Sequence, residues 1–337
     1  MEDAREVFGL DPGESFDPED LDEEPFDLGT PHIMTVTGPI DPGALGVTLH
    51  HEHVLCNPQA VAGEDPDAVL DDPHASLAEL EDFYSAGGWA LLDASTADYG
   101  RDIRGMAWIA ERAPVHLIVV TGHHKALHAT PHIEGKGVDD VAAVSVRELT
   151  EGIEGTGIKA GVVKAGTSLD AILDIEKTAL RAAARAHLET GAPITTHTEQ
   201  GTMALEQIAI LREEGVDPSR VIVGHLDRRL DEAYLRQVLE TGAFASFDQV
   251  SKAAYGRDEP KAAMLKCLVD AGHADQLLVS QDLARKSLLR AYGGEPGWVY
   301  ILERFSLLLM EAGLDAITVR QLLVDNPARA LTIRRAA

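Results

Sequence analysis

The stretch Thr48-Leu-His-His-Glu-His53 lies in a short β-forming segment and places four polar residues at its end. Side chains alternate along a strand, so His51 and His53 are expected on one face and Glu52 on the other. Similar apolar runs recur, and the eight predicted strands cover residues 47–54, 89–94, 115–121, 161–165, 193–198, 220–226, 243–247 and 277–280. Segments with helical spacing lie between them, among them residues 169–189, 202–214, 232–240 and 260–271. This alternation predicts a parallel sheet.

Eight strands are the number that closes into a (β/α)8 TIM barrel in a chain of this length. An open, doubly wound sheet is the alternative, but no glycine-rich phosphate loop follows the first predicted strand. Residues 35–40 with the turn Asp41-Pro42-Gly43 predict a small hairpin beneath the barrel. We therefore predict an α/β protein with one (β/α)8 barrel domain over residues 31–337.

The first 30 residues are predicted to be a mobile acidic extension. Residues 1–27 hold twelve Asp or Glu residues and one Arg, with few apolar anchors to offset the entropy of ordering. The formal net charge of the chain is -27, which argues against nucleic acid as a partner. The chain has no long apolar run typical of a membrane span, and its acidic start does not resemble a secretory signal. We expect a cytoplasmic protein.

Polar side chains stand at or near the ends of five of the predicted strands. They are residues that metal ions favour or that can be modified to bind metal, namely His51, His53, Lys164, His197, His225 and Asp282. The carboxyl ends of the strands of a parallel barrel meet at one mouth, where catalytic residues lie. Each residue alone has an ordinary reading, such as a packed histidine pair or an aspartate that caps a helix. Their joint placement predicts a site for zinc, manganese, iron or cobalt.

Lys164 needs a separate explanation, because it follows a run that is expected to be buried. A protonated lysine about 4 Å from a divalent ion is repelled by about 8 kcal/mol at an effective dielectric constant of about 20. Burial and a nearby metal both lower the pKa of a lysine. The neutral amine could then react with carbon dioxide to give a carbamate, whose two oxygens could bridge two metal ions.

These residues resemble the phosphotriesterase-like branch of the amidohydrolase superfamily, over nearly the whole chain from about Thr35 to Leu331. The resemblance rests on the motifs Thr48-Leu-His-His-Glu-His53, Gly157-Ile-Lys-Ala-Gly-Val-Val-Lys164, Pro193-Ile-Thr-Thr-His-Thr198, Val221-Ile-Val-Gly-His-Leu-Asp227, Leu278-Val-Ser-Gln-Asp282 and Asn326-Pro-Ala-Arg329.

The resemblance implies a role for each of the six residues. His51, His53 and Asp282 would hold the more buried of two divalent ions, with zinc favoured over manganese, cobalt or iron. His197 and His225 would hold the other ion, and N6-carboxylated Lys164 would bridge both. The nucleophile would be a hydroxide between the metals. Asp282 would then accept its proton.

Cationic residues are predicted to lie on the loops around the barrel mouth and to bind an anionic group of a small-molecule substrate. They are Lys125, Arg228, Lys252, Arg257, Arg285 and Lys286. The strings Gly122-His-His-Lys125, Gly224-His-Leu-Asp-Arg228 and Asp282-Leu-Ala-Arg-Lys286 resemble the branch that hydrolyses phosphorylated sugar lactones. This resemblance implies a lactonase for a phosphorylated aldono-lactone.

Two departures and two expected lining residues affect the pocket. His124 stands where this branch would carry a bulkier or aromatic residue, and Lys286 stands where an arginine is expected. Lysine lacks the planar fork with which arginine holds a phosphate. Tyr99 and Tyr255 are expected to line part of the pocket.

Three other functions stay open at this point. The same metal centre could serve a phosphotriesterase or an acyl-homoserine lactonase, although the loops lack the apolar lining that a long acyl chain or a bulky triester requires. A mononuclear enzyme such as a deaminase would not need Lys164. A non-catalytic metal-binding barrel is the remaining alternative. The resemblance also implies a homodimer.

Overall fold

The computed structural model describes residues 26–334, so the acidic segment 1–25 lies outside it and its mobility stays a prediction. Eight parallel strands form one sheet, and each strand pairs with the next strand along the chain. The strands are β3 (Thr48–Glu52), β4 (Ala90–Asp93), β5 (His116–Gly122), β6 (Val162–Thr167), β7 (Ile194–Thr198), β8 (Val221–Val223), β9 (Phe244–Phe247) and β10 (Leu277–Val279). This order confirms the barrel, because a doubly wound sheet would reverse its strand order at one point.

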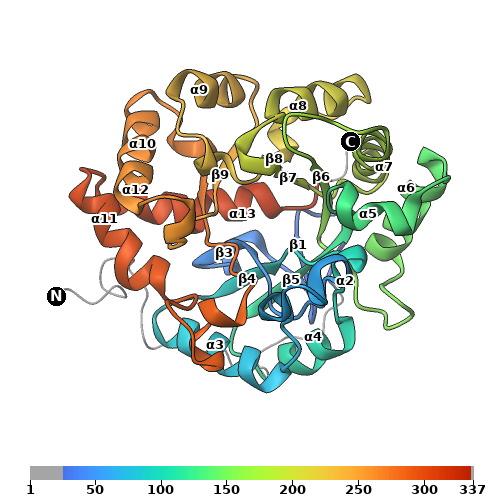
Figure 1. The fold of residues 1–337 in the computed structure, drawn as a ribbon, viewed down its shortest axis with the longest axis horizontal. Coiled ribbons are helices and arrows are strands. Elements are labelled where there is room, and N and C mark those ends of the chain that lie inside the picture. The colour runs from blue at the N-terminus through green and yellow to red at the C-terminus, as the bar shows by residue number, and fades with distance from the viewer. Residues whose placement is uncertain (1–25, 335–337) are drawn as a thin grey trace.

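Helices surround the sheet (Figure 1). They are α2 (Gln59–Ala62), α3 (Pro73–Ser85), α4 (Ile103–Ala110), α5 (Ala126–Ile133), α6 (Val138–Thr150), α7 (Asp174–Thr190), α8 (Ala204–Glu213), α9 (Glu232–Glu240), α10 (Asp258–Asp270), α11 (Ser306–Glu311), α12 (Ala316–Arg320) and α13 (Asn326–Leu331). The predicted helix over 232–240 coincides with α9, whereas α7 begins five residues later than the predicted start at 169. None of the helices in residues 26–334 combines the length and apolar character needed to cross a membrane.

The predicted hairpin is present at one end of the barrel. Strands β1 (Ile33–Thr35) and β2 (Gly38–Ile40) pair antiparallel, and the next residue after β1 reaches the barrel, where the Val36 amide donates to Leu117 O at 2.7 Å. Ile33 belongs to a buried apolar cluster that also contains Leu331 and inward-facing residues of several strands. The hairpin and the C-terminal helix therefore cover an apolar floor.

Side-chain alternation places Lys164 one layer above this floor. In β6, Val162 belongs to the floor cluster and Val163 to the larger core between strands and helices. Lys164 is the next residue on the inward face, and its side chain is fully buried. Gly122 of β5 pairs with Lys164 and has a φ of 91°. An added Cβ at Gly122 would lie 2.1 Å from the Lys164 carbonyl oxygen, so only glycine lets the two strands approach here.

Glu52 joins β3 to the segment after β10, the two neighbouring strands of the barrel between which no backbone hydrogen-bond ladder forms in the described residues. β3 and β10 are the two ends of the strand order among the described residues. Glu52 Oε1 accepts hydrogen bonds from Ser280 Oγ and the Gln281 amide, both at 2.7 Å, and Oε2 accepts from the Leu283 amide at 2.8 Å. The Asp282 amide also donates to His51 O at 3.0 Å. A buried carboxylate therefore joins the first strand to the loop that carries Asp282.

We expect the substitution Glu52→Gln to lower the free energy of unfolding by about 2–3 kcal/mol, because an amide nitrogen would face one of the buried donors. It should also weaken metal binding by displacing Asp282. Chemical denaturation and metal titration measure the two effects.

Glu176→Gln is the matched control for this substitution. The Glu176 carboxylate is equally buried and accepts from one hydroxyl and two amides, those of Ser168, Ala126 and Leu173. It should lose similar stability and keep its metal affinity. Equal metal affinities in the two variants would contradict the role given to Glu52.

Candidate active site

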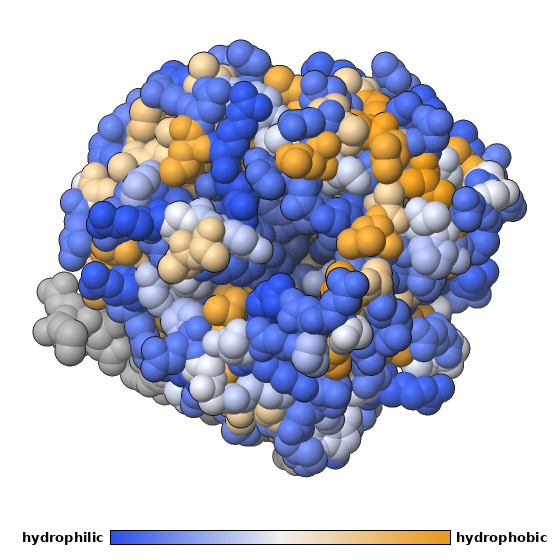
Figure 2. All heavy atoms as spheres, viewed as in Figure 1, coloured by the Kyte–Doolittle hydropathy of each residue, from blue (hydrophilic) through white to orange (hydrophobic). Residues whose placement is uncertain are grey.

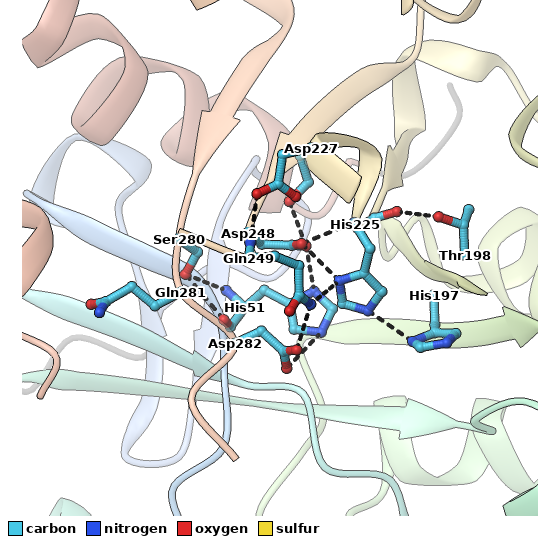
Figure 3. Close-up of polar contacts among 12 residues, drawn as sticks. His51, His197, Thr198, His225, Asp227, Asp248, Gln249, Ser280, Gln281 and Asp282 are labelled. Carbon is cyan, nitrogen blue, oxygen red and sulfur yellow. Dashed lines mark hydrogen bonds and ion pairs between the residues drawn. The ribbon is translucent and has the colours of Figure 1, made fainter. Parts of the chain in front are cut away.

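The six predicted metal-site residues converge at the mouth of the barrel. His51 lies in β3 with His53 just beyond it, Lys164 lies in β6 and His197 in β7. His225 and Asp282 lie past the ends of β8 and β10, which are shorter than the predicted strands. The close-up in Figure 3 shows His51, His225 and Asp282 turned toward one another, with His197 beside His225.

One group of ligand atoms lies between β3 and β10. Asp282 Oδ1 lies 3.2 Å from His53 Nε2 and 3.8 Å from His51 Nε2. Ligand atoms of these three residues all lie within 4.8 Å of one another, so they could hold a metal ion. Lys164 Nζ lies 3.4 Å from His51 Nε2 and donates to Ala94 O at 2.8 Å.

The other two histidines face each other. His225 Nε2 lies 2.7 Å from His197 Nδ1, and the two rings are nearly perpendicular at 78°. The ring centroids of His51 and His225 are 4.9 Å apart. The second pair of donors therefore lies directly beside the first group.

Two of these residues have strained backbone conformations. His225 has a φ of 60° and Asp282 a φ of 51°, in the left-handed region that side chains other than glycine rarely adopt. Such strain costs on the order of 1–3 kcal/mol at each residue and is typical of functional sites. At both positions the strand has ended and the backbone turns the side chain back over the mouth.

Asp248 was missed by the sequence analysis, although it fixes the orientation of two histidines. It directly follows β9 and is fully buried. Asp248 Oδ1 lies 2.7 Å from His225 Nδ1, and Oδ2 lies 3.1 Å from His51 Nδ1 (Figure 3). An ionised carboxylate accepts from Nδ1–H, which leaves the Nε2 lone pairs of both rings for a metal ion. The sequence did contain a signal for Asp248, because an acidic residue directly after the seventh predicted strand is expected at the barrel mouth.

His50 was also missed, for a different reason. The pairing of β3 with β4 shifts register between Leu49 and Glu52. This irregularity lets His50, as well as its neighbour His51, face the interior. His50 Nε2 lies 2.6 Å from Ser246 Oγ, which donates to Asp248 Oδ2 at 2.6 Å. Strict alternation along the strand does not predict this contact.

The electrostatic environment favours the neutral form of His51, His53 and His197 and the charged form of Asp282. Burial also acts on His225, but the Asp248 carboxylate outweighs it and raises the pKa of this histidine. Burial, assisted by Lys164, lowers the pKa of His51 to about 3, and burial with His225 lowers the pKa of His197 to about 3. Burial also lowers the pKa of Lys164, against the opposite effect of the nearby carboxylates. Burial raises the pKa of Asp282, but Lys252 and the histidines outweigh it and hold this pKa well below its ordinary value. Neutral imidazoles and an ionised carboxylate are the forms that bind metal ions.

A cavity of about 780 Å³ lies over these residues. The face of the molecule in Figure 2 is hollowed near its centre, and the surface around the hollow is mostly hydrophilic. Tyr99 and Tyr255 line the cavity, as expected from the sequence.

The six predicted substrate-binding cations divide into two groups. Lys125, Lys252 and Arg285 line the cavity. Lys125 forms an ion pair with Glu199, which also lines the cavity and was not predicted. Lys252 Nζ lies 2.9 Å from Asp282 Oδ2, and Arg285 pairs with Asp65.

The other three cations are absent from the cavity lining. The Arg228 guanidinium stacks on the Tyr255 ring, 3.6 Å from its centroid, and so supports a lining residue. The Arg257 side chain is 80% exposed and pairs with Glu259. Lys286 pairs with Asp71 at 2.8 Å. Their roles in substrate binding stay predictions, and the geometry favours the first group.

An α/β barrel that gathers imidazole, amine and carboxylate groups at its mouth is the architecture of amidohydrolase-type enzymes. Residues 31–331 match the model of the phosphotriesterase family. A lactonase of known structure from Listeria monocytogenes is 38% identical, with a TM-score of 0.87 over 90% of this chain and 100% of that one.

Two further relatives cover most of this chain. A phosphotriesterase homology protein from Escherichia coli is 33% identical over 84% of this chain and 97% of its own length. A phospho-furanose lactonase from Mycoplasmopsis synoviae is 32% identical over 88% of this chain and 90% of its own length. The chain belongs to the phosphotriesterase family. It is a hydrolase that acts on ester bonds.

Asp248→Asn should weaken metal binding about 10–100-fold, because an amide cannot accept from both histidine rings. Titration of the metal-free protein with zinc measures this affinity. Asp258→Asn is the control, since Asp258 is also buried but pairs with Lys261, away from the histidines. Unchanged zinc affinity in Asp248→Asn would show that Asp248 does not orient the ligands.

Proposed function

We propose that this chain is a binuclear metal-dependent lactonase that opens a sugar lactone carrying a phosphate group. The observation that carries the proposal is the convergence of His51, His53, Lys164, His197, His225 and Asp282 beneath a cavity lined by cations. The small anionic substrate would lie with its ester carbonyl over these residues.

The donor set fits two divalent ions. His51 Nε2, His53 Nε2 and Asp282 Oδ1 would hold one ion, and His197 Nδ1 and His225 Nε2 the other. Four imidazoles with a carboxylate suit zinc, which we propose as the native metal. Bound metals would supply Lewis-acid polarisation of the ester oxygen and a water that is acidic near neutral pH.

Two buried lysines show why Lys164 is suited to carboxylation. Lys261 is buried, and its Nζ lies 3.2 Å from Asp258 Oδ1 and 3.6 Å from Asp227 Oδ2. Lys164 has no such ion pair in the described structure, and its Nζ faces the histidines instead. A neutral Lys164 amine would react with carbon dioxide, forming an N–C bond and releasing one proton. The product carries two oxygens between the two groups of ligands.

We expect protein loaded with zinc and 13C-labelled bicarbonate to show one carbamate signal in its 13C NMR spectrum. Lys164→Met should remove the signal, and Lys261→Met should keep it. If only Lys261→Met lost the signal, the carbamate would lie on Lys261 and not on Lys164. Its absence from the metal-loaded wild type would overturn the proposed bridging role.

The side chains around the metals would position the substrate and accept a proton. Asp282 Oδ1 faces the histidines, whereas Oδ2 lies 2.6 Å from Gln249 Nε2 and 2.9 Å from Lys252 Nζ. One oxygen of this carboxylate is therefore directed at the metal site, and the other can take a proton. Lys252 and Arg285 lie on loops after neighbouring strands, where they could hold the phosphate group.

The relatives support this choice of substrate. Two of them are named as phospho-furanose lactonases, and the Escherichia coli homologue has been crystallised with phosphate in its active site. The cavity is lined by cationic, acidic, imidazole and hydroxyl groups, and an uncharged triester would leave many of them without hydrogen-bond partners.

The proposed function is tested by screening zinc-loaded enzyme against aldono-lactones with and without a phosphate. The phosphorylated substrates should have the higher kcat/KM. Arg285→Ala should lower kcat/KM for them about 10–100-fold, because it removes a charge-assisted contact, and should leave the unphosphorylated ones nearly unchanged. Arg257→Ala is the control outside the cavity. Preferential turnover of triesters or acyl-homoserine lactones would refute the proposal, as would no turnover of any ester by fully metallated protein.

A further inference from the structure

One side of the cavity is built from three rings whose polar atoms are not fully paired. Tyr99, His124 and His128 all line the cavity. The Tyr99 and His124 rings stack at 5.1 Å with an interplanar angle of 14°, and His128 packs edge-on against both. Within residues 26–334, the Tyr99 hydroxyl and the His128 ring make no hydrogen bond.

The orientation of His124 is fixed by its own loop. The Lys125 amide donates to His124 Nδ1 at 2.8 Å, so Nδ1 is an acceptor and the proton of the neutral ring lies on Nε2. No other hydrogen bond of this ring is formed with the described residues. His124 therefore presents an N–H donor.

His128 is buried against the cavity wall. It is 5% exposed, and its Nδ1 is enclosed without a partner. The ring nevertheless lines the cavity, which leaves Nε2 as the atom that can reach a ligand. Burial lowers the pKa of His128 to about 4, so the ring is neutral and does not compete with the cations for an anion.

This imidazole wall, defined as Tyr99, His124 and His128, lies across the barrel from Lys252, whereas Lys125 lies beside it on the loop after β5. His124 and His128 follow β5, the third of the eight strands, whereas Lys252 follows β9, the seventh. The third and seventh strands of an eight-stranded barrel face each other. The metal-site residues lie between the two sides.

We propose that the imidazole wall, and His128 in particular, is the subsite that binds the ring hydroxyls of the substrate. This proposal rests on the proposed lactonase function and adds the orientation of the bound substrate to it. The anionic end points to the loops after β9 and β10, and the hydroxyl-bearing ring carbons point to the loop after β5. The wall then makes the enzyme specific for hydroxylated lactones.

The physical reason lies in the cost of unpaired buried groups. A substrate hydroxyl can donate or accept, so it can pair with a Tyr hydroxyl, an N–H or an imidazole lone pair. A deoxygenated or alkyl ring would exclude water from the wall and leave its polar atoms without partners. Sites that hydrogen-bond a hydroxyl reject the analogue lacking it far more strongly than apolar pockets reject an added methylene.

The test compares two uncharged probes, a pentono-γ-lactone and its deoxygenated parent γ-butyrolactone, with the zinc-loaded full-length enzyme. We expect wild type to prefer the hydroxylated lactone. His128→Phe keeps an aromatic ring but removes both nitrogens, and it should reduce this preference in kcat/KM about 10-fold, equivalent to one lost hydrogen bond. The change should come from the hydroxylated substrate alone. His128→Gln should recover part of the preference.

His132→Phe is the matched control, because His132 lies on the same helix α5, is exposed and does not line the cavity. It should leave the preference unchanged. Equal losses for both lactones in His128→Phe and His128→Gln, with normal zinc content, would overturn the subsite by showing a structural role only, and an unchanged preference would overturn it directly. If wild type hydrolyses no lactone at all, the proposed function itself fails, whereas turnover of both probes at equal rates refutes only the hydroxyl subsite.

Discussion

The site depends on how the barrel closes. Seven of the eight strand neighbours are joined by ladders, but the last junction, between β3 and β10, relies on the Glu52 carboxylate and the amide of Asp282. The residues on both sides of this junction are proposed metal ligands. A backbone ladder would hold the two strands in register. It would not direct the Ser280 hydroxyl and the Gln281 and Leu283 amides at one carboxylate beyond the strand end. Glu52 stands between His51 and His53, and period-two alternation turns it away from the metal site. The same short segment therefore supplies two ligands and the group that positions a third.

Closure alone does not prepare the histidines, because an imidazole can present either nitrogen. Here each ring has its second nitrogen beside a polar group. His225 and His51 face Asp248, His53 Nδ1 lies 2.7 Å from Ser95 Oγ, and His197 Nε2 lies 3.3 Å from Glu199 Oε2. The left-handed backbones of His225 and Asp282 cost free energy, which the buried network around them must offset. Bound metal ions would add further stability, because they bind the folded chain and not the unfolded one. The site is thus held in its binding geometry at the expense of local strain.

The sequence predicted the barrel, the hairpin and the placement of six residues at one mouth, because these follow from local patterns. Apolar runs mark strands, and polar residues at their ends must meet once the sheet closes. It could not predict the register shift in β3 that turns His50 inward, since a bulge depends on packing against β4. It also could not tell which cations face the cavity. Arg257 and Lys252 are five residues apart on one loop, yet one is exposed and the other contacts Asp282. That difference depends on the contact of Lys252 with Asp282, which is distant in the sequence, whereas Arg257 pairs with the nearby Glu259.

The distribution of charge over the cavity determines which molecules it can accept. Each cation that lines it already has a carboxylate partner, whether Glu199, Asp65 or Asp282. An incoming anion must compete with these acids, so long-range attraction alone would be weak in so acidic a protein. Two bound divalent ions would change this balance, because they would neutralise Asp282 and release Lys252 to a ligand. The rings of Tyr99, His124 and His128, across the barrel from Lys252, carry no charge and have no such competitor. A molecule with an anionic end and a hydroxylated end satisfies both sides at once, whereas a molecule with either feature alone leaves one side unpaired.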